Sequence, residues 1–173
     1  MVPTRDALKV ARTSAVPTAS STSWRDAIYK GDDNYYLEAS SEPGGRPVAG
    51  GTVGGTNVNL SGPSGLVTNT WTFLAATYDG ATLRLYVNGT QVASQARTGV
   101  IATSTNQVQI GGDSIYGQYF RGSIDEVRIY NRGLTAAQIP SFYKDASFGV
   151  PSGQVERTYS PRAGCTVQRD GNF

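Results

Sequence analysis

Residues 71–96 read WTFLAATYDGATLRLYVNGTQVASQA, and this stretch decides the fold class of the 173-residue chain. Three strand-like segments, residues 71–78, 82–87 and 91–96, are separated by Asp79-Gly80 and Asn88-Gly89. Two-residue Asp-Gly and Asn-Gly turns of type I′ match the twist of paired strands. The stretch therefore predicts a three-stranded antiparallel meander.

The middle segment of this meander alternates apolar and polar side chains. Leu83, Leu85 and Val87 alternate with Arg84 and Tyr86. Because successive side chains of a strand point to opposite faces, one face is expected on a core and the other toward water or a ligand. The pattern thus predicts a sheet that is half exposed.

The composition agrees with an all-β fold and excludes several other classes. The 21 glycines, 10 tyrosines and only 16% charged residues are typical of many short strands joined by tight turns. The net charge of +2 is scattered along the chain, so nucleic acid is not an expected partner. No stretch is apolar enough to span a membrane. The single cysteine, Cys165, excludes an intrachain disulfide framework.

Further strands are expected on both sides of the meander. Residues 24–30 and 35–39 flank Gly31-Asp32-Asp33-Asn34, which predicts a hairpin with an acidic tip. Residues 40–65 predict loops and a single strand at 56–60. Two more strands are expected at 107–110 and 124–130, separated by a loop rich in glycine and tyrosine at 111–122.

A short helical turn is expected after the last strand. Thr135 and Gln138 have the spacing of a capping box, and Leu134 and Ile139 have that of a hydrophobic staple. Pro140 lacks the N–H that a longer helix needs, so the turn is expected to stop or kink early.

Both ends of the chain are expected to lie outside the folded domain. Residues 13–23 are almost entirely Ser, Thr, Ala, Pro and Val, a composition that buries little surface. Residues 1–13 carry three basic side chains without an apolar run and do not have the pattern of a signal peptide. The expected division is a poorly structured N-terminal segment and linker at 1–23, a domain at 24–148 and an irregular tail at 149–173.

Several separate stretches resemble bacterial laminin-G-like domains of the concanavalin A-like superfamily. They are residues 29–37 (YKGDDNYYL), 69–80 (NTWTFLAATYDG), 83–89 (LRLYVNG) and 122–135 (GSIDEVRIYNRGLT). The resemblance implies an antiparallel two-sheet jelly-roll sandwich. It also implies further opening strands, of which only residues 7–11 have the character of a remnant. A domain without them is expected to self-associate through an unpaired sheet edge, unless residues 7–11 or the tail fill the gap.

The chain is expected not to be an enzyme. It contains no histidine, which excludes His-based triads, His general bases and His metal sites. Glycosidases need two carboxylates facing each other across the bond that is cleaved. Those of this superfamily carry Glu-x-Asp-x-Glu or Glu-x-Asp-x-x-Glu along one strand, and neither pattern occurs here.

Asp125 is the candidate metal ligand. Strict alternation places it on the same face as Val127 and Ile129, which have the character of core residues. Either its carboxylate accepts backbone N–H bonds at a strand entrance, or it binds Ca²⁺, as laminin-G-like relatives often do.

Two groups of residues are candidates for ligand binding. The hairpin tip offers Asp32, Asp33 and Asn34, and the glycine- and tyrosine-rich loop offers Asp113, Tyr116, Tyr119 and Arg121. Aromatic faces beside hydrogen-bonding groups suit sugars, which present apolar C–H faces edged by hydroxyls. Turn chemistry at the tip and packing of the tyrosines in the loop are the structural alternatives.

The function expected from these features is that of an extracellular, non-catalytic carbohydrate-binding or adhesive accessory module. Its expected partner is a glycan or another cell-surface ligand. A structural or protein-binding module is the first alternative, because a fold of this type hosts many ligands. A degenerate glycosidase-type domain is the second.

Overall fold

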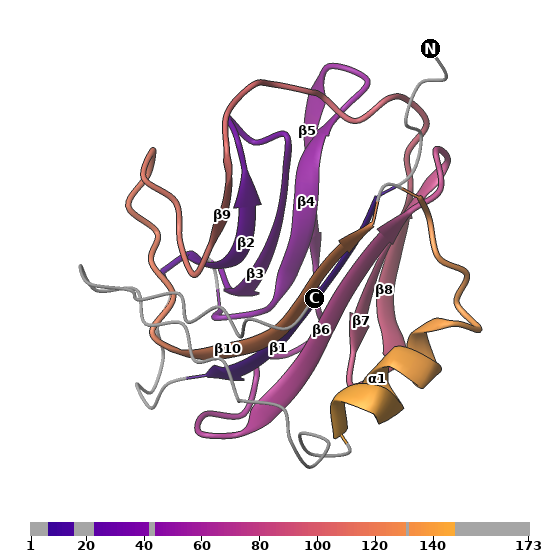
Figure 1. The fold of residues 1–173 in the computed structure, drawn as a ribbon. Helices are drawn as coiled ribbons and strands as arrows, with labels where there is room; N and C mark the ends of the chain where they lie inside the picture. Colours follow the sequence, from indigo (N-terminus) through magenta and orange to yellow (C-terminus); the bar gives the residue numbers. More distant parts are fainter. Residues whose placement is uncertain (1–6, 16–22, 42–43, 131, 148–173) are drawn as a thin grey trace, which may run out of the picture.

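The computed structural model describes residues 7–15, 23–41, 44–130 and 132–147, which form ten strands and one helix. The strands make two antiparallel sheets of five strands each, stacked face to face (Figure 1). The tail expected at 149–173 and most of the expected linker lie outside the described residues. Within them, no helix is long and apolar enough to cross a membrane.

The first sheet has the order β10-β1-β6-β7-β8. Its strands are β10 (Gly122–Tyr130), β1 (Ala7–Ala15), β6 (Trp71–Tyr78), β7 (Thr82–Val87) and β8 (Thr90–Ala96). The expectation that residues 1–23 are poorly structured is wrong for β1, which pairs with β10 on one side and β6 on the other. Its sequence, ALKVARTSA, contains few residues that favour a strand. A strand in this position still forms, because pairing with both neighbours stabilises it.

The second sheet has the order β5-β4-β3-β2-β9. Its strands are β5 (Thr56–Ser61), β4 (Val48–Val53), β3 (Tyr35–Ser40), β2 (Arg25–Lys30) and β9 (Val108–Ile110). Strand β4 was not expected, since its sequence VAGGTV contains two glycines, which are unfavourable inside a strand. Gly50 is needed there because a Cβ at this position would lie 2.2 Å from the ring of Tyr36 on β3.

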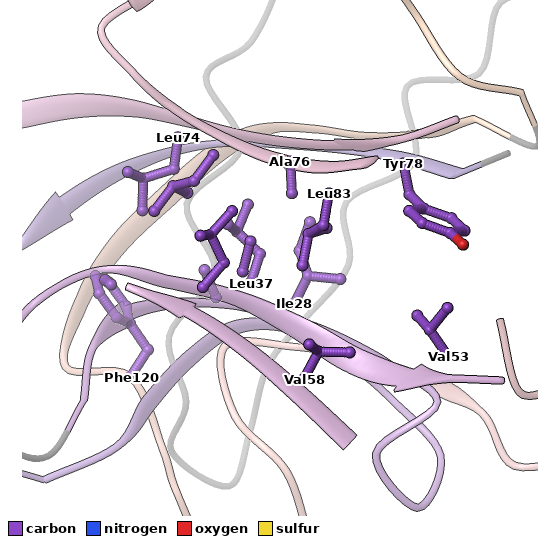
Figure 2. Packing of buried hydrophobic residues seen from close by; sticks show 14 of the residues in the cluster. Ile28, Leu37, Val53, Val58, Leu74, Ala76, Tyr78, Leu83 and Phe120 are labelled. Carbon is purple, nitrogen blue, oxygen red and sulfur yellow. The ribbon is translucent and has the colours of Figure 1, made fainter. Parts of the chain in front are cut away.

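The hydrophobic core lies between the two sheets (Figure 2). Leu74, Ala76 and Tyr78 of β6 face Ile28 of β2 and Leu37 of β3 across it. Leu37, Leu74 and Ile28 are fully buried, and burying a side chain of this size stabilises the fold by about 1.5–3 kcal/mol. Packing between the sheets therefore carries most of the stability, as expected for a chain without an intrachain disulfide.

The two turns of the meander differ from each other. At Asn88-Gly89 both residues have positive φ, 50° and 78°, as a type I′ turn requires. At Asp79-Gly80 only Gly80 has positive φ, and the connection extends to Ala81. The Asp79 Oδ1 atom accepts the N–H groups of Ala81 at 3.0 Å and Thr82 at 2.7 Å, so this carboxylate completes the turn.

The outer face of the first sheet is covered, not open as the alternation in β7 predicted. Tyr86 is only 1% exposed because Leu134 and the helix α1 (Ile139–Ser147) pack against it and against Phe73. One half of the capping box is present, since the Thr135 N–H donates to Gln138 Oε1 at 3.0 Å, while the Gln138 N–H donates to the Thr135 carbonyl oxygen at 2.9 Å. Pro140 does not stop the helix, because it occupies the second position, where a missing N–H leaves no hydrogen bond unmade.

Strand β10 contains a β-bulge that breaks the alternation of its side chains. Arg12 of β1 pairs with Asp125 and Val10 pairs with Arg128, so two residues of β10 oppose Ala11. Glu126, within the bulge, has φ of 52°. Ile124 before the bulge and Val127 after it both contact the core.

Candidate functional site

The tip of the β2–β3 hairpin holds its acidic residues in a fixed turn. Gly31 and Asp33 have φ of 57° and 51°, a conformation that Gly adopts freely and Asp tolerates. The Asn34 N–H donates to Lys30 O at 3.0 Å and closes the turn. Asp32 is exposed and Asp33 is half-buried. The expected acidic tip is therefore present.

Tyr29 fixes the Asp33 side chain from below. The Asp33 N–H donates to the Tyr29 hydroxyl at 2.9 Å, and that hydroxyl donates to Asp33 Oδ1 at 3.2 Å. Burial of the phenol raises its pKa above the ordinary value, so Tyr29 stays neutral and keeps its proton for this bond. The hairpin tip is consequently rigid at its acidic residue.

Two asparagines of β5 extend this polar surface across the sheet. Asn57 Nδ2 donates to Asp33 Oδ2 at 2.9 Å, which ties β5 to the hairpin tip. The Tyr36 hydroxyl lies 2.8 Å from Asn57 Oδ1 and 2.7 Å from Asn59 Oδ1. Both asparagines are exposed, whereas Tyr36 is 4% exposed.

Sequence reasoning missed Asn57 and Asn59 as site residues. Their alternation with Val58 and Leu60 indicates that they share a face, but it does not indicate what lies beside them. Tyr36 reaches them across β4 only because Gly50 has no side chain in the path of its ring. Without β4 in the prediction, this contact was not visible.

The β9–β10 loop is organised by a buried carboxylate. Asp113 is 0% exposed, and its Oδ1 accepts the Tyr116 N–H while its Oδ2 accepts the Gln118 N–H at 3.0 Å. Asp113 thus shapes the loop from beneath and does not reach the surface. The Asp26 N–H donates to Gln118 O at 3.1 Å, so the loop is also fastened to β2.

Tyr116 brings the loop and the hairpin tip together. Its hydroxyl donates to Asp32 Oδ1 at 3.3 Å, and its ring contacts Tyr29 edge-on with the centroids 6.3 Å apart. Tyr116 is 51% exposed. We call the continuous surface formed by Asp32, Asp33, Asn57, Asn59 and Tyr116 the hairpin–loop surface.

Besides the buried Asp113, three more of the expected site residues lie outside this surface. Asn34 is buried, and its Oδ1 accepts the Ser104 hydroxyl at 2.5 Å, so it anchors the segment before β9. Tyr119, 47% exposed, and the exposed Arg121 lie at the other end of the loop. There Arg25 Nη1 donates to Tyr119 O at 3.2 Å, and Arg121 lowers the pKa of Arg25 through charge repulsion, after the larger effect of burial. We call Arg25, Tyr119 and Arg121 the basic end.

Beneath the surface lie two buried carboxyl groups that sequence reasoning did not single out. Asp26 and Glu38 pair across β2 and β3 and are 0% and 3% exposed. Burial first, and then the neighbouring carboxylates, raise the pKa of Asp26 to about 9 and that of Glu38 to about 10. Both groups are therefore neutral at pH 7.

The surroundings of Asp26 explain why it keeps its proton. Neither of its oxygens has a hydrogen-bond partner among the described residues, and besides burial the nearby Asp113 and Asp33 carboxyl groups raise its pKa. A buried carboxyl group without donors to stabilise its charge favours the neutral form.

Asp125 is not on the core face that strict alternation predicted. It follows Ile124, which is 1% exposed in the core, so its side chain points to the opposite face, and the bulge at Glu126 restores the core face only at Val127. Its Oδ1 accepts the Glu126 N–H at 2.8 Å. In the part of the chain that the structure describes, no three Cys, Asp or Glu side chains are grouped to hold a metal ion. Calcium binding through Asp125 stays a prediction without support from its surroundings.

The stacked sheets, the topology and the core define a jelly-roll β-sandwich. The family model of the concanavalin A-like lectin/glucanases superfamily matches residues 15–140. The chain belongs to this superfamily, which confirms the resemblance found in its sequence.

The chain spans only a small part of the length of the curated relative that it matches. Pappalysin-1 of Mus musculus is 32% identical over 115 residues, which make up 59% of this chain and 7% of the mouse protein. Among solved structures, domain 4 of AbnA, an extracellular arabinanase from Geobacillus stearothermophilus, in complex with arabinotriose, has a TM-score of 0.61 at 19% identity. The match covers 83% of this chain and 68% of that domain.

A second solved structure is the CBM40 of the Ruminococcus gnavus IT-sialidase bound to alpha2,3 sialyllactose. It has a TM-score of 0.61 at 18% identity, with 82% of this chain and 84% of that chain covered. At these identities the likeness shows the fold alone.

Proposed function

We propose that the chain is a non-catalytic, extracellular carbohydrate-binding or adhesive accessory module that binds its ligand at the hairpin–loop surface. The observation that carries the proposal is the convergence of three separate segments, the β2–β3 tip, β5 and the β9–β10 loop, on one exposed polar surface. An exposed tyrosine beside carboxylates and amides suits a sugar, because the ring stacks on C–H groups and the polar atoms bind hydroxyls. Membership of the superfamily and the carbohydrate ligands named for two structural neighbours support this choice.

Two features support a role without catalysis. The chain has no histidine, and the facing carboxyl pair nearest to the surface, Asp26 and Glu38, is buried. A glycosidic bond must lie between the two carboxyl groups that cleave it. Since Asp26 and Glu38 pair directly across neighbouring strands beneath the surface, there is no room for a sugar between them.

A glycan array followed by calorimetry tests the proposal. We expect binding to at least one class of oligosaccharide, and we expect Asn57→Ala with Asn59→Ala to weaken it roughly thirtyfold, since two lost hydrogen bonds of about 1 kcal/mol each sum to about 2 kcal/mol. Gln91→Ala is the matched control, because Gln91 is exposed on β8 of the other sheet and should leave the affinity unchanged. A folded protein that binds no glycan on the array would contradict the proposal and favour a protein-binding or structural module.

A further inference from the structure

We infer that the hairpin–loop surface selects neutral or amino sugars and rejects glycans that carry carboxylates, such as sialosides and uronosides. The inference rests on the proposed function and adds the chemical class of its ligand. It follows from the charges and the hydrogen-bonding groups that surround the surface.

The charge around this surface is negative throughout the described residues. Asp32 and Asp33 are on the surface, and the Asp113 carboxylate is buried behind Tyr116. The electrostatic neighbours of Asp33 are Asp32 and Asp113, and those of Tyr116 are Asp33 and Asp32. No described lysine or arginine contacts any of these carboxylates, whereas Asp79 and Glu126 on the other sheet each have an arginine partner.

The nearest lysine faces away from the surface. Lys30 pairs with Tyr35, which packs against the core side of the second sheet. Its Nζ atom donates to Ser104 O at 3.1 Å and also to Asn106 O. Lys30 is therefore occupied by backbone carbonyls beyond the sheet edge and does not neutralise the acidic tip.

The surface keeps acceptors at its aspartates and some donors at its asparagines. Asn57 donates one amide N–H to Asp33, and the Tyr116 hydroxyl donates to Asp32, whereas the Asn59 amide has only a 3.5 Å contact with Asn57 Oδ1. Each aspartate keeps unused acceptor sites, because a carboxylate offers about four of them. A ligand group that contacts the aspartates must therefore bring donors. Sugar hydroxyls and the ammonium group of an amino sugar supply them, whereas a carboxylate brings only acceptors and a like charge.

Arg25 of the basic end is too far away to compensate. Arg25 stands at the start of β2 and Asp32 just past its end, so a strand rise of about 3.3 Å per residue separates them by roughly 20 Å. This exceeds the screening length of about 8 Å at physiological salt. A carboxylate bound beside Asp32 would therefore meet the aspartates without help from Arg25.

The test uses two pairs of glycans in which one member carries a carboxylate, and a third pair that compares N-acetyl groups with free amines. An array carries lactose with alpha2,3-sialyllactose, xylotriose with its glucuronate-bearing derivative, and N-acetylated with deacetylated chitotriose. We expect every glycan that binds to be neutral or amino, and to bind at least tenfold more tightly than its carboxylated partner at low salt. Added salt should narrow this difference.

Substitutions test whether the charge of the hairpin–loop surface causes this discrimination between glycans. Asp32→Asn with Asp33→Asn should raise the affinity for the carboxylated glycans and reduce the discrimination, since Asn keeps the turn geometry and removes the charge. Asp79→Asn, on the other sheet, is the matched control and should leave the affinities for neutral and carboxylated glycans unchanged. Carboxylated glycans that bind as tightly as their neutral partners, with binding weakened by Asn57→Ala and Asn59→Ala, would overturn the inference and leave the proposed function intact. An array without any binding would overturn both.

Discussion

The buried carboxyl groups of Asp26 and Glu38 make the stability of the protein depend on pH. The folded protein keeps a proton on Asp26 up to a pKa of about 9, and on Glu38 up to about 10, whereas in the unfolded chain both groups lose it near pH 4. Between these values the folded state holds more protons than the unfolded state. Raising the pH therefore lowers the free energy of unfolding by about 1.4 kcal/mol per pH unit for each group.

The change Asp26→Asn should remove one of these two contributions. Asparagine has nearly the same shape as aspartate but no titratable proton, so the side chain stays neutral at every pH. We expect this variant to show about half the pH slope of the parent between pH 5 and 8, and to be the more stable of the two at pH 8. Urea unfolding at a series of pH values measures both quantities. The same slope in parent and variant would mean that Asp26 is charged in the folded protein.

Strand β1 is the element on which the first sheet depends. It pairs with β6 through eight residue pairs, from Ala7↔Tyr78 to Ser14↔Trp71, and with β10 on its other side. A strand in this position uses its backbone N–H groups for ladders on both sides, so a proline within it removes a hydrogen bond that no water can replace. Residues 7–15 are thus part of the folded domain, although their composition does not indicate it.

We expect Val10→Pro to destabilise the protein by about 3 kcal/mol or more, in line with other proline substitutions that break regular structure. Val10→Thr keeps both the N–H group and the β-branched shape, and it serves as the control with little expected loss. Circular dichroism during thermal unfolding gives the comparison. Equal melting temperatures for the two variants would show that β1 does not hold this place in solution.

For the whole molecule, the position of β1 bears on association. Self-association through an unpaired sheet edge is expected unless residues 7–11 or the tail fill the gap. In the structure β1 fills the place between β6 and β10, in agreement with the first of these alternatives. The remaining edges of the second sheet are the three-residue β9 and the polar β5, and short or polar edges resist pairing with other chains.

We therefore expect a monomer that unfolds in one cooperative transition. Light scattering over a hundredfold concentration range should give a constant molar mass, and two spectroscopic probes should give the same unfolding midpoint. A mass that rises with concentration would indicate that an edge strand pairs with a second copy, and proline substitutions in each of the four edge strands, β5, β8, β9 and β10, would identify which one.

The features that depend on neighbouring residues could be predicted from the sequence alone. Asn88-Gly89 set a type I′ turn, the residues around Asp33 set the acidic hairpin tip, and Thr135 with Gln138 set the start of the helical segment. Each of these rests on turn or cap chemistry within a few residues. The alternation of Leu83 and Leu85 likewise marked their face as core.

The contacts between segments that are distant in the sequence became visible only in the folded protein. The tertiary structure placed β1 in the middle of a sheet, covered Tyr86 with α1, turned Asp125 away from the core through a bulge, and let Tyr36 pass over Gly50 to Asn57. It also joined Tyr116 to Asp32 across 84 residues of sequence. The physical reason is that the pairing of remote strands is selected by packing and backbone hydrogen bonds summed over the whole sheet. A short stretch of sequence does not contain this information.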